Sequence, residues 1–226
     1  MLLNLDAGEH DDEPEELWAL ADVVAIACGG HAGDEQSMAR VVAFCAGRDR
    51  PGIGAHPSYP DRLNFGRRTL SIDPDPLRQS IAHQCTALAK VAAAQGQRVR
   101  WVKPHGALYH EAAKDLSIAA AVLFGAREAL GHDIIVIGPP SGVMCDAAAQ
   151  CDLQYLREGF ADRALLPDGS LVPRGEPNAL ITDPAAAATR ARELIDTVDT
   201  ICVHGDTPGA LAIARTVRAV LDASGA

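Results

Sequence analysis

The chain has 226 residues, of which 48% are hydrophobic, and its 20 basic and 30 acidic residues give a formal net charge of −10. This length can bury a full core and predicts one α/β domain over residues 1–226. The acidic balance and the lack of a basic cluster argue against nucleic acid or an anionic membrane surface as a partner, and no apolar stretch is long enough to cross a membrane. The first residues lack the features of a signal peptide, so we expect a cytoplasmic protein.

Short apolar runs alternate with alanine-rich, helix-length segments along the whole chain. The runs that predict strands are residues 2–6, 22–28, 52–56, 99–105, 133–138, 153–159 and 200–206. The segments that predict helices are residues 35–48, 75–96, 112–130, 141–150, 184–197 and 208–223. This alternation predicts a parallel sheet of seven strands covered by helices. Two further connections, 57–71 and 160–180, are long enough to carry function.

An open doubly wound sheet and a closed β/α barrel both fit this order of elements, and the alternation of side chains favours the barrel. A strand between two helix layers is apolar on both faces, whereas these strands are aliphatic on one face only. The other face becomes polar towards the C-terminal end of each strand. It carries Asn4 and Asp6; Gly54 and His56; Trp101, Lys103 and His105; and Cys202, His204 and Asp206. We therefore expect helices outside and a polar mouth at the C-terminal rim.

Four of the eight histidines stand at the ends of predicted strands, each near glycine or proline. They are His31, in the segment ACGGHAGD, and His56, His105 and His204. An imidazole titrates near neutral pH, and Asp6, Glu9 and Asp206 add carboxylates that can orient a ring or act as bases. Each residue alone has an ordinary explanation as a turn or capping residue. Together at one rim, they predict a catalytic site.

Lys103, in the segment WVKPHGALYH, is the strongest single catalytic candidate. Burial on the inner face of a barrel strand lowers the pKa of a lysine unless an anion offsets the effect. The alternative is a structural lysine–aspartate pair. Cys202 and His204 form a weaker candidate for a nucleophile and its base.

Polar residues near the predicted mouth are candidates for holding a substrate. Those that we select are Asn4, Asp34, Arg67, Glu158 and Arg163. An arginine on a rim loop can bind a carboxylate through two parallel hydrogen bonds, and Arg163 lies close to the end of the sixth predicted strand. Asp34 has the alternative of capping the next helix. The long connections also contain Arg62, Arg68, Asp162, Asp168 and Arg174.

Several familiar signatures are missing. The chain contains neither the phosphate-binding loop G-x-x-x-x-G-K-[ST] nor G-x-G-x-x-G after its first strand. It also lacks the G-x-S-x-G nucleophile elbow. The six cysteines form no C-x-x-C pair, which predicts core positions rather than a zinc or disulfide framework.

Seven segments resemble, in order, the signature blocks of the LamB/YcsF family. They are LNLDAGE, AIACGGHAGD, GAHPSYPDRLNFGRR, VKPHGALYH, EGFADR, DGSLVPR and CVHGDTPGA. The resemblance implies an irregular seven-stranded, TIM-like β/α barrel of the glycoside hydrolase and deacetylase type. It also implies a subunit of an ATP-dependent 5-oxoprolinase, in which ATP is handled with partner subunits B and C and a small lactam, 5-oxo-L-proline, is opened to L-glutamate. The rim histidines, Asp6 and Lys103 would then serve as base, acid and stabiliser of developing charge.

The sequence departs from the family pattern at two positions near His31. The family usually has asparagine and phenylalanine where this chain has Ala25 and Gly30, so we expect Gly30 to open space beside His31. Two segments, 9–18 and 174–201, look shortened.

Two other functions stay open. One is a stand-alone, metal-dependent deacetylase or amidohydrolase, with Asp6, His31 and His56 as ligands of a divalent metal ion. The other is a binding subunit without catalytic residues. A barrel of this kind can also pair with a second copy through its helices, so a homo-oligomer stays open as well.

Overall fold

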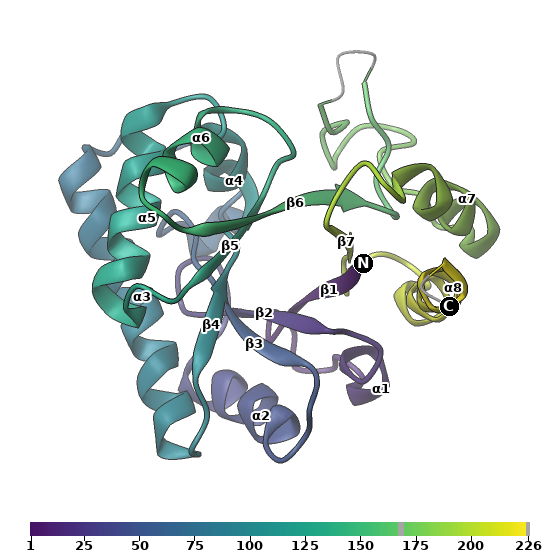
Figure 1. The fold of residues 1–226 in the computed structure, drawn as a ribbon, viewed down its shortest axis with the longest axis horizontal. Coiled ribbons are helices and arrows are strands. Elements are labelled where there is room, and N and C mark those ends of the chain that lie inside the picture. Colours follow the sequence, from purple (N-terminus) through teal and green to yellow (C-terminus); the bar gives the residue numbers. More distant parts are fainter. Residues whose placement is uncertain (167–169, 225–226) are drawn as a thin grey trace.

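Seven strands close into a barrel in the computed structural model, which describes residues 1–166 and 170–224 (Figure 1). The strands are β1 (Leu2–Ala7), β2 (Val23–Ala27), β3 (Gly52–His56), β4 (Val99–Val102), β5 (Ile135–Gly138), β6 (Gln154–Phe160) and β7 (Thr200–Val203). Each strand pairs in parallel with the next, and β1 pairs with β7 to complete the ring. The predicted barrel is confirmed, and the open doubly wound sheet is excluded.

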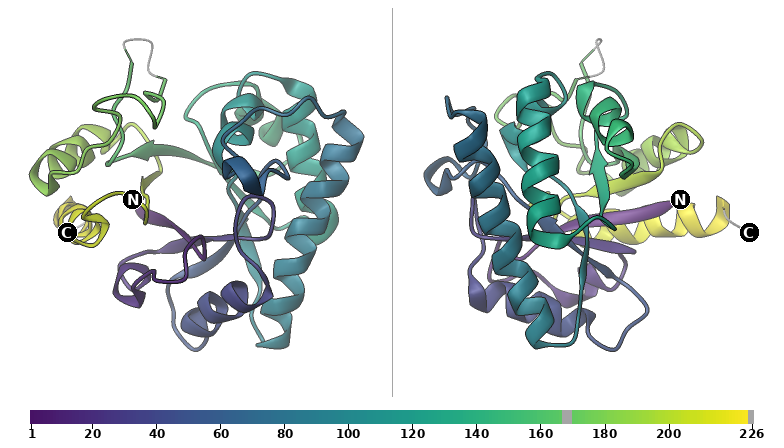
Figure 2. Two further views of the ribbon diagram at one scale, coloured as in Figure 1. Left: turned by 180° about the vertical axis from the view of Figure 1, so that it is seen from behind. Right: turned by 60° about the vertical axis from the view of Figure 1, so that its left-hand side comes forward.

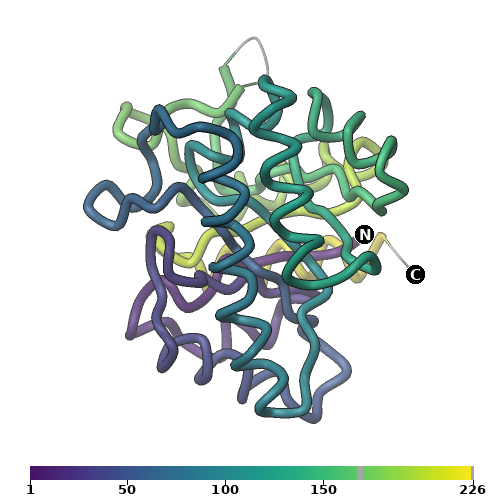
Figure 3. The backbone as a smooth tube through the Cα atoms, turned by 90° about the vertical axis from the view of Figure 1, so that its left-hand side faces the viewer, coloured from purple at the N-terminus to yellow at the C-terminus, as the bar shows by residue number. Residues whose placement is uncertain are grey.

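The helices lie outside this ring (Figure 1). They are α1 (Glu15–Trp18), α2 (Glu35–Cys45), α3 (Pro74–Ala94), α4 (Gly106–Ala112), α5 (Leu116–Leu130), α6 (Val143–Gln150), α7 (Pro184–Leu194) and α8 (Ala210–Ser224), with a short 3-10 helix, η1, at Arg62–Asn64. The helix predicted over 112–130 begins later, as α5 at Leu116, because the Asp115 side chain accepts hydrogen bonds from the backbone of Ser117 and Ile118 and caps it, and the short helix α4 ends just before it at Ala112. α3 and α5 lie side by side along one flank (Figure 3).

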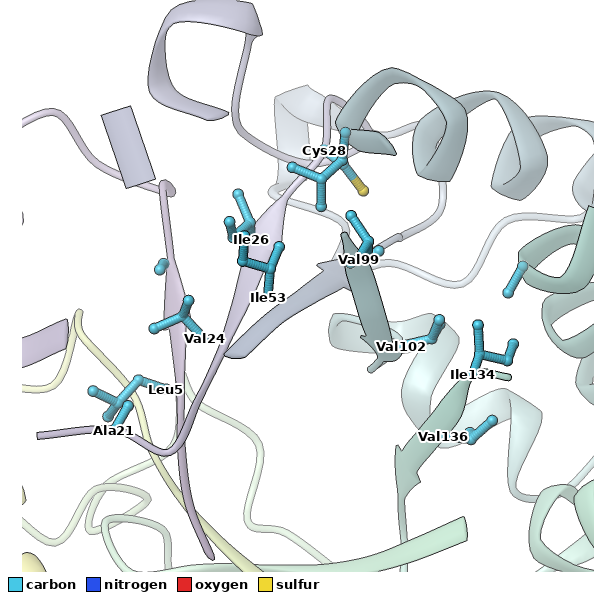
Figure 4. Packing of buried hydrophobic residues seen from close by; sticks show 14 of the residues in the cluster. Leu5, Ala21, Val24, Ile26, Cys28, Ile53, Val99, Val102, Ile134 and Val136 are labelled. Carbon is cyan, nitrogen blue, oxygen red and sulfur yellow. The ribbon is translucent and has the colours of Figure 1, made fainter. Parts of the chain in front are cut away.

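Aliphatic side chains on the outer faces of the strands form the layer between barrel and helices (Figure 4). Leu5, Val24 and Val136 are fully buried in this layer. The opposite face of β1 points into the barrel, where Asn4 and Asp6 are buried. The two faces are therefore divided as the alternation predicted.

An aromatic ring closes the barrel interior near the beginning of β3. The Trp101 ring fills the space beside Gly52, where an added Cβ would come within 2.3 Å of the ring. His56, Lys103 and His105, by contrast, are buried at or just beyond the ends of their strands.

The strand predicted over 99–105 is shorter than expected, because its pairing with β5 stops at Val102. Contact with β3 nevertheless continues. The backbone N–H of Lys103 donates to Ala55 O at 2.9 Å, and that of His105 donates to Pro57 O at 2.8 Å. Both side chains thus remain on the inner face of the barrel.

The first and last elements, β1 and α8, lie next to each other (Figure 2). Ring closure pairs Leu2 with Thr200 and Leu5 with Val203, so the two ends of the chain meet in one sheet. Among the described residues, no helix has both the length and the apolar character required to span a bilayer.

Candidate active site

Lys103 is the centre of a buried polar cluster inside the barrel mouth. Its Nζ donates hydrogen bonds to Asp6 Oδ1 at 2.7 Å, to Asn4 Oδ1 at 3.0 Å and to the Cys202 sulfur at 3.1 Å. Glu158 Oε1 lies 3.1 Å from the same nitrogen. The side chains of Lys103 and Asp6 are each 3% exposed. One ammonium thus connects β1, β6 and β7 away from water.

The pKa of Lys103 lies well above its ordinary value. Burial acts to lower it, but the charge of Asp6, supported by Cys202 and Glu158, outweighs burial. Burial likewise acts to raise the pKa of Asp6, yet the charges of His56 and Lys103 hold that pKa well below its ordinary value. Lys103 is therefore a stable cation near neutral pH, as the lysine–aspartate alternative anticipated, and not a free amine base.

Glu9 and three histidines form a second cluster beside the first. Glu9 Oε1 lies 2.9 Å from His31 Nε2, 3.3 Å from His105 Nδ1 and 3.8 Å from His56 Nε2. His105 Nδ1 lies 3.0 Å from His56 Nε2. The rings of His31 and His105 are stacked, with centroids 3.6 Å apart. His56 Nε2 also lies 3.4 Å from Asp6 Oδ2, which joins the two clusters.

Backbone carbonyl groups orient two of these rings. His56 Nδ1 lies 2.7 Å from Lys103 O, and His105 Nε2 lies 3.0 Å from Phe65 O. Because a carbonyl oxygen only accepts, these two nitrogens carry protons, which leaves His56 Nε2 and His105 Nδ1 as the nitrogens that face the cluster. Burial acts to lower the pKa of His56, but the charge of Asp6 outweighs burial and raises that pKa, whereas burial lowers the pKa of His105. Burial, reinforced by the nearby His105, lowers the pKa of His31 to about 3, so that ring is neutral near pH 7.

His204 is held by a carboxylate, Asp162, that the sequence pattern placed only among the loop residues. Asp162 Oδ1 lies 3.0 Å from His204 Nδ1, and Oδ2 accepts hydrogen bonds from the His204 backbone N–H at 3.0 Å and the Thr207 hydroxyl at 2.6 Å. Burial acts to raise the pKa of Asp162, but the charge and hydrogen bonds of His204 lower it below its ordinary value. His204 Nε2 then lies 3.9 Å from Asp6 Oδ2. The position of Asp162 just after β6, at the rim, was the signal that could have identified it.

The ACGGHAGD segment holds His31 in a tight loop after β2. Gly33 has a φ of +80°, and a Cβ there would come within 2.2 Å of Ala27 O, so only glycine fits this position. Arg62 reaches over from the first long connection and donates to the carbonyl oxygens of Gly29 and Gly33 at 3.3 and 2.8 Å. The loop is thus fixed by the close approach of Gly33 to the backbone of Ala27 and by the guanidinium of Arg62.

Asp34, one of the predicted substrate ligands, is the N-cap residue of α2. Its Oδ1 accepts a hydrogen bond from the Ser37 N–H at 2.8 Å, and the Asp34 N–H donates to the Ser37 hydroxyl at 2.9 Å. The side chain is exposed, because the chain has already turned away from the mouth at Gly33. The capping alternative is the correct one.

Gly30 does not open space beside His31, contrary to expectation. A Cβ at Gly30 would lie 2.3 Å from Gln84 Oε1 and 2.4 Å from Ser58 Oγ. Gln84 is fixed there, since its Oε1 accepts from the Ser58 N–H at 3.0 Å and its Nε2 donates to Ser58 O at 2.8 Å. A side chain from α3 fills the space that the family pattern suggested would be empty.

Asp206 pairs with arginines at the mouth instead of joining the histidines. Its carboxylate lies 2.8 Å from Arg67 Nη2 and 2.7 Å from Arg174 Nη1. β7 ends at Val203 and a turn follows, so the alternation that placed Asp206 on the inner face no longer applies. Asp206 is therefore corrected from a catalytic candidate to an ion-pair partner of the rim arginines.

Arg163 lies beside this group and is 7% exposed. Its Nη2 donates to Val172 O at 2.7 Å, while its buried Nε has no hydrogen-bond partner among the described residues. Burial, followed by the charge of Arg174, lowers the pKa of Arg163, and Arg67 acts in the same direction. The group thus has an excess of positive charge. The predicted candidate Asp168 lies outside the described residues.

Cys202 is not arranged as a nucleophile with His204. Its sulfur lies 3.1 Å from Lys103 Nζ. Burial raises the pKa of Cys202 well above the ordinary value, despite the opposing charge of Lys103, so the thiol stays protonated. All six cysteines are free, and Cys28, Cys45, Cys85 and Cys202 are buried.

Two groups of donor atoms among the described residues have the proximity needed to hold a metal ion. One consists of Glu9, His31, His56 and His105, and the other of Asp6, Cys202 and His204. The donor group that contains His31 and His56 therefore has Glu9 and His105 as its other members, whereas the expected ligand Asp6 lies in the second group. Asp6 belongs to the second group because Lys103 holds its Oδ1 at 2.7 Å.

Known proteins are similar to this chain in sequence and in fold. The A subunit of 5-oxoprolinase from Methylococcus capsulatus is 42% identical over 242 residues, covering 99% of this chain and 92% of that protein. The protein of the same name from Streptomyces avermitilis is 40% identical, covering 99% of this chain and 96% of that protein. The crystal structure of a lactam utilization protein from Thermus thermophilus matches with a TM-score of 0.88 and 31% identity, covering 100% of this chain and 97% of that one.

A family 4 carbohydrate esterase from Streptomyces lividans, 13% identical, shares the fold alone, with a TM-score of 0.50 over 100% of this chain and 88% of that one. Residues 2–226 match the sequence model of the LamB/YcsF family. The chain belongs to the LamB/YcsF family.

Proposed function

We propose that this chain is one component of an ATP-dependent 5-oxoprolinase that opens the lactam ring of 5-oxo-L-proline to L-glutamate. Full-length similarity to proteins named as the A subunit of 5-oxoprolinase supports the substrate and the reaction. The observation that carries the proposal is the cluster around Lys103, in which a buried ammonium contacts two buried carboxylates at the barrel mouth. Buried charges of this kind are costly for stability and are characteristic of functional sites.

The chemistry requires activation of a stable ring amide. In the proposed reaction, the γ-phosphoryl group of ATP is transferred to the lactam oxygen and ADP leaves. Water then adds to the ring carbon, and the C–N bond breaks with its electron pair and a proton going to nitrogen. A second water releases phosphate from the γ-glutamyl phosphate that results. We assign the handling of ATP to a complex with partner subunits B and C.

His204 is suited to the proton transfers. Asp162 binds its Nδ1 side, which leaves Nε2 as the nitrogen that faces Asp6 and the mouth. A histidine held in this way can take a proton from water and return it to the leaving nitrogen. Lys103 fixes Asp6 and supplies positive potential where negative charge develops on the substrate oxygen.

Two groups are suited to hold the substrate. Oε1 of buried Glu158 lies 3.1 Å from the Lys103 ammonium, and Oε2 has no hydrogen-bond partner among the described residues, so Oε2 can accept a hydrogen bond from the ring N–H. The guanidinium groups of Arg163 and Arg67 lie in a region of excess positive charge that suits the substrate carboxylate. Asn4 positions Lys103, because its Nδ2 donates to Thr200 Oγ1 at 2.9 Å and its Oδ1 faces the ammonium.

The proposal is tested by mixing the purified chain with subunits B and C and measuring glutamate release with and without ATP. We expect release only with ATP and with all subunits present. His204→Asn should lower kcat by about 100-fold or more, whereas His83→Asn, at an exposed position on α3, should leave it unchanged.

Full turnover without this chain rejects the proposal. Lactam or amide hydrolysis by the chain alone, without ATP, supports the stand-alone amidohydrolase instead. Unchanged turnover with both His204→Asn and Lys103→Met supports a binding subunit without catalytic residues.

A further inference from the structure

Four loops at the rim bring one carboxylate and three imidazole rings to a single point. Glu9 follows β1, His31 follows β2, His56 ends β3 and His105 follows β4. One donor atom from each lies within 4.8 Å of the donor atoms of the other three. The side chains of Glu9 and His105 are 6% and 8% exposed, and those of His31 and His56 are still less exposed.

The hydrogen bonds around this point leave electron pairs facing one another. The protons of His56 and His105 are directed to backbone carbonyl oxygens on the far sides of the two rings. His56 Nε2 and His105 Nδ1 therefore face each other at 3.0 Å, and His105 Nδ1 also faces Glu9 Oε1 at 3.3 Å. When His56 Nε2 carries no second proton, each of these atoms presents a lone pair to the others. Such an arrangement of acceptors is repulsive unless a positive species lies among them.

We propose that Glu9, His31, His56 and His105 bind one divalent transition-metal ion, with Zn²⁺ as the ion that best fits these ligands. Three nitrogens and one carboxylate oxygen suit zinc and its neighbours in the first transition row, whereas magnesium and calcium prefer oxygen ligands. A tetrahedral zinc site with bonds of about 2.0–2.1 Å has ligand atoms about 3.3 Å apart. The separations of 2.9, 3.0, 3.3 and 3.8 Å fall on both sides of that value.

Carbonyl groups hold two of these rings in place, whereas the rings of His31 and His105, stacked and parallel within 3°, must tilt for one ion to lie in both ring planes. Donation of the second ring N–H to a carbonyl oxygen, as at His56 and His105, is the usual support for a metal-binding imidazole. Gly66, with a φ of +64°, permits the stacking: a Cβ there would come within 2.9 Å of His31 Cβ and 3.1 Å of His105 Cδ2. His31 Nδ1 has no hydrogen-bond partner in the described part of the chain, so this ring is oriented by packing and by the contact of its Nε2 with Glu9 Oε1 at 2.9 Å.

An extra proton is the competing occupant, and geometry separates the two. A proton lies on one line between two atoms, whereas Glu9 Oε1 faces three ring nitrogens at once. The neighbouring donor group offers a contrast, because there the Lys103 ammonium already lies 2.7 Å from Asp6 and 3.1 Å from Cys202. The Lys103 ammonium thus already supplies the positive charge at the group formed by Asp6, Cys202 and His204.

Metal binding is measured directly on the full chain, so the outcome does not depend on the proposed reaction. The protein is treated with a chelator, dialysed and titrated with ZnCl₂ by calorimetry, and Co²⁺ is then used as a probe by visible absorption. We expect about one equivalent of Zn²⁺ per chain and Co²⁺ bands of a four-coordinate site. Glu9→Gln and His105→Ala should each weaken Zn²⁺ binding by about 100-fold or more.

Two matched variants serve as controls. His83→Ala removes an exposed imidazole on α3, and Cys202→Ser removes a donor of the neighbouring group; both should retain wild-type binding. Circular dichroism confirms that each variant is folded, and Glu9→Gln remains informative if His105→Ala does not fold. Absence of stoichiometric binding by the wild type overturns the inference, as does full binding by folded Glu9→Gln. Loss of binding in Cys202→Ser would move the metal to the other group and overturn it as well.

Discussion

Replacing Lys103 by methionine should destabilise the protein far more than its single positive charge suggests. Methionine keeps much of the length and the apolar stem of lysine, so the change removes mainly the ammonium. Without it, Asp6 and Glu158 stay buried and lose the cation that lies 2.7 and 3.1 Å from them. Breaking a buried ion pair from one side costs about 3–5 kcal/mol, because the remaining charge is left uncompensated.

For a chain of this size, about 3–5 kcal/mol corresponds to a fall in Tm of roughly 6–20 °C. Urea unfolding followed by circular dichroism measures the free energy of unfolding, and a thermal scan measures Tm. Glu158→Gln in the Lys103→Met background should recover part of the loss, because it removes one of the two unpaired charges.

Lys114→Met is the matched control. The Lys114 side chain is 73% exposed and lies 3.9 Å from Glu111, and such surface pairs contribute about 0–1 kcal/mol. Equal losses of unfolding free energy for Lys103→Met and Lys114→Met would refute the reasoning. A double variant less stable than Lys103→Met alone would refute the part assigned to Glu158.

Asp162→Asn should lower the free energy of unfolding by about 1.5–3 kcal/mol at pH 7, where the charged hydrogen bonds of this carboxylate are intact. The pKa of Asp162 is held below the ordinary value of about 3.9, so its contribution to stability is complete above that pH and is lost as the pH falls through the folded-state pKa. Urea unfolding at several pH values should show the stability of the variant approaching that of the wild type below about pH 4. A difference that stays constant with pH would contradict this. Gly33→Ala should cost at least twice as much as Gly29→Ala in the same unfolding assay: both have positive φ, worth roughly 1–2 kcal/mol, but only at position 33 does the new Cβ meet backbone. Asp34→Ala should lower Tm by about 2–4 °C through loss of the α2 cap without changing KM for the lactam, whereas a raised KM would restore Asp34 as a substrate ligand.

The fold and the inner cluster followed from rules that hold within a strand. The alternation of Leu3, Asn4, Leu5 and Asp6 is enforced by the pleat, and each face is buried as that alternation predicted. Lys103 obeyed the same rule even beyond the end of β4, because its backbone still bonds to β3. Local pattern was sufficient wherever a ladder of hydrogen bonds fixed the direction of the side chain.

The failures lie where no ladder acts. Asp206 follows a turn after β7, so its direction is set by Arg67 and Arg174 from two distant loops. The space beside Gly30 is filled by Gln84, whose position depends on how α3 packs against the barrel. Neither position can be predicted from the neighbouring residues in the sequence, because both depend on contacts that form only when the chain folds.

Closure of the ring through β1 and β7 has a consequence for how the chain reaches this fold. As the protein is synthesised from its N-terminus, one edge of β1 stays unpaired until β7 emerges close to the end of translation. Until then β1 and β6 each present an unpaired edge, which is an opportunity for faulty association with other chains. Joining the neighbouring ends and opening the chain between two helices elsewhere would keep the architecture while letting these two strands emerge one after the other. The vulnerable interval is therefore a property of the order of synthesis and not of the finished barrel.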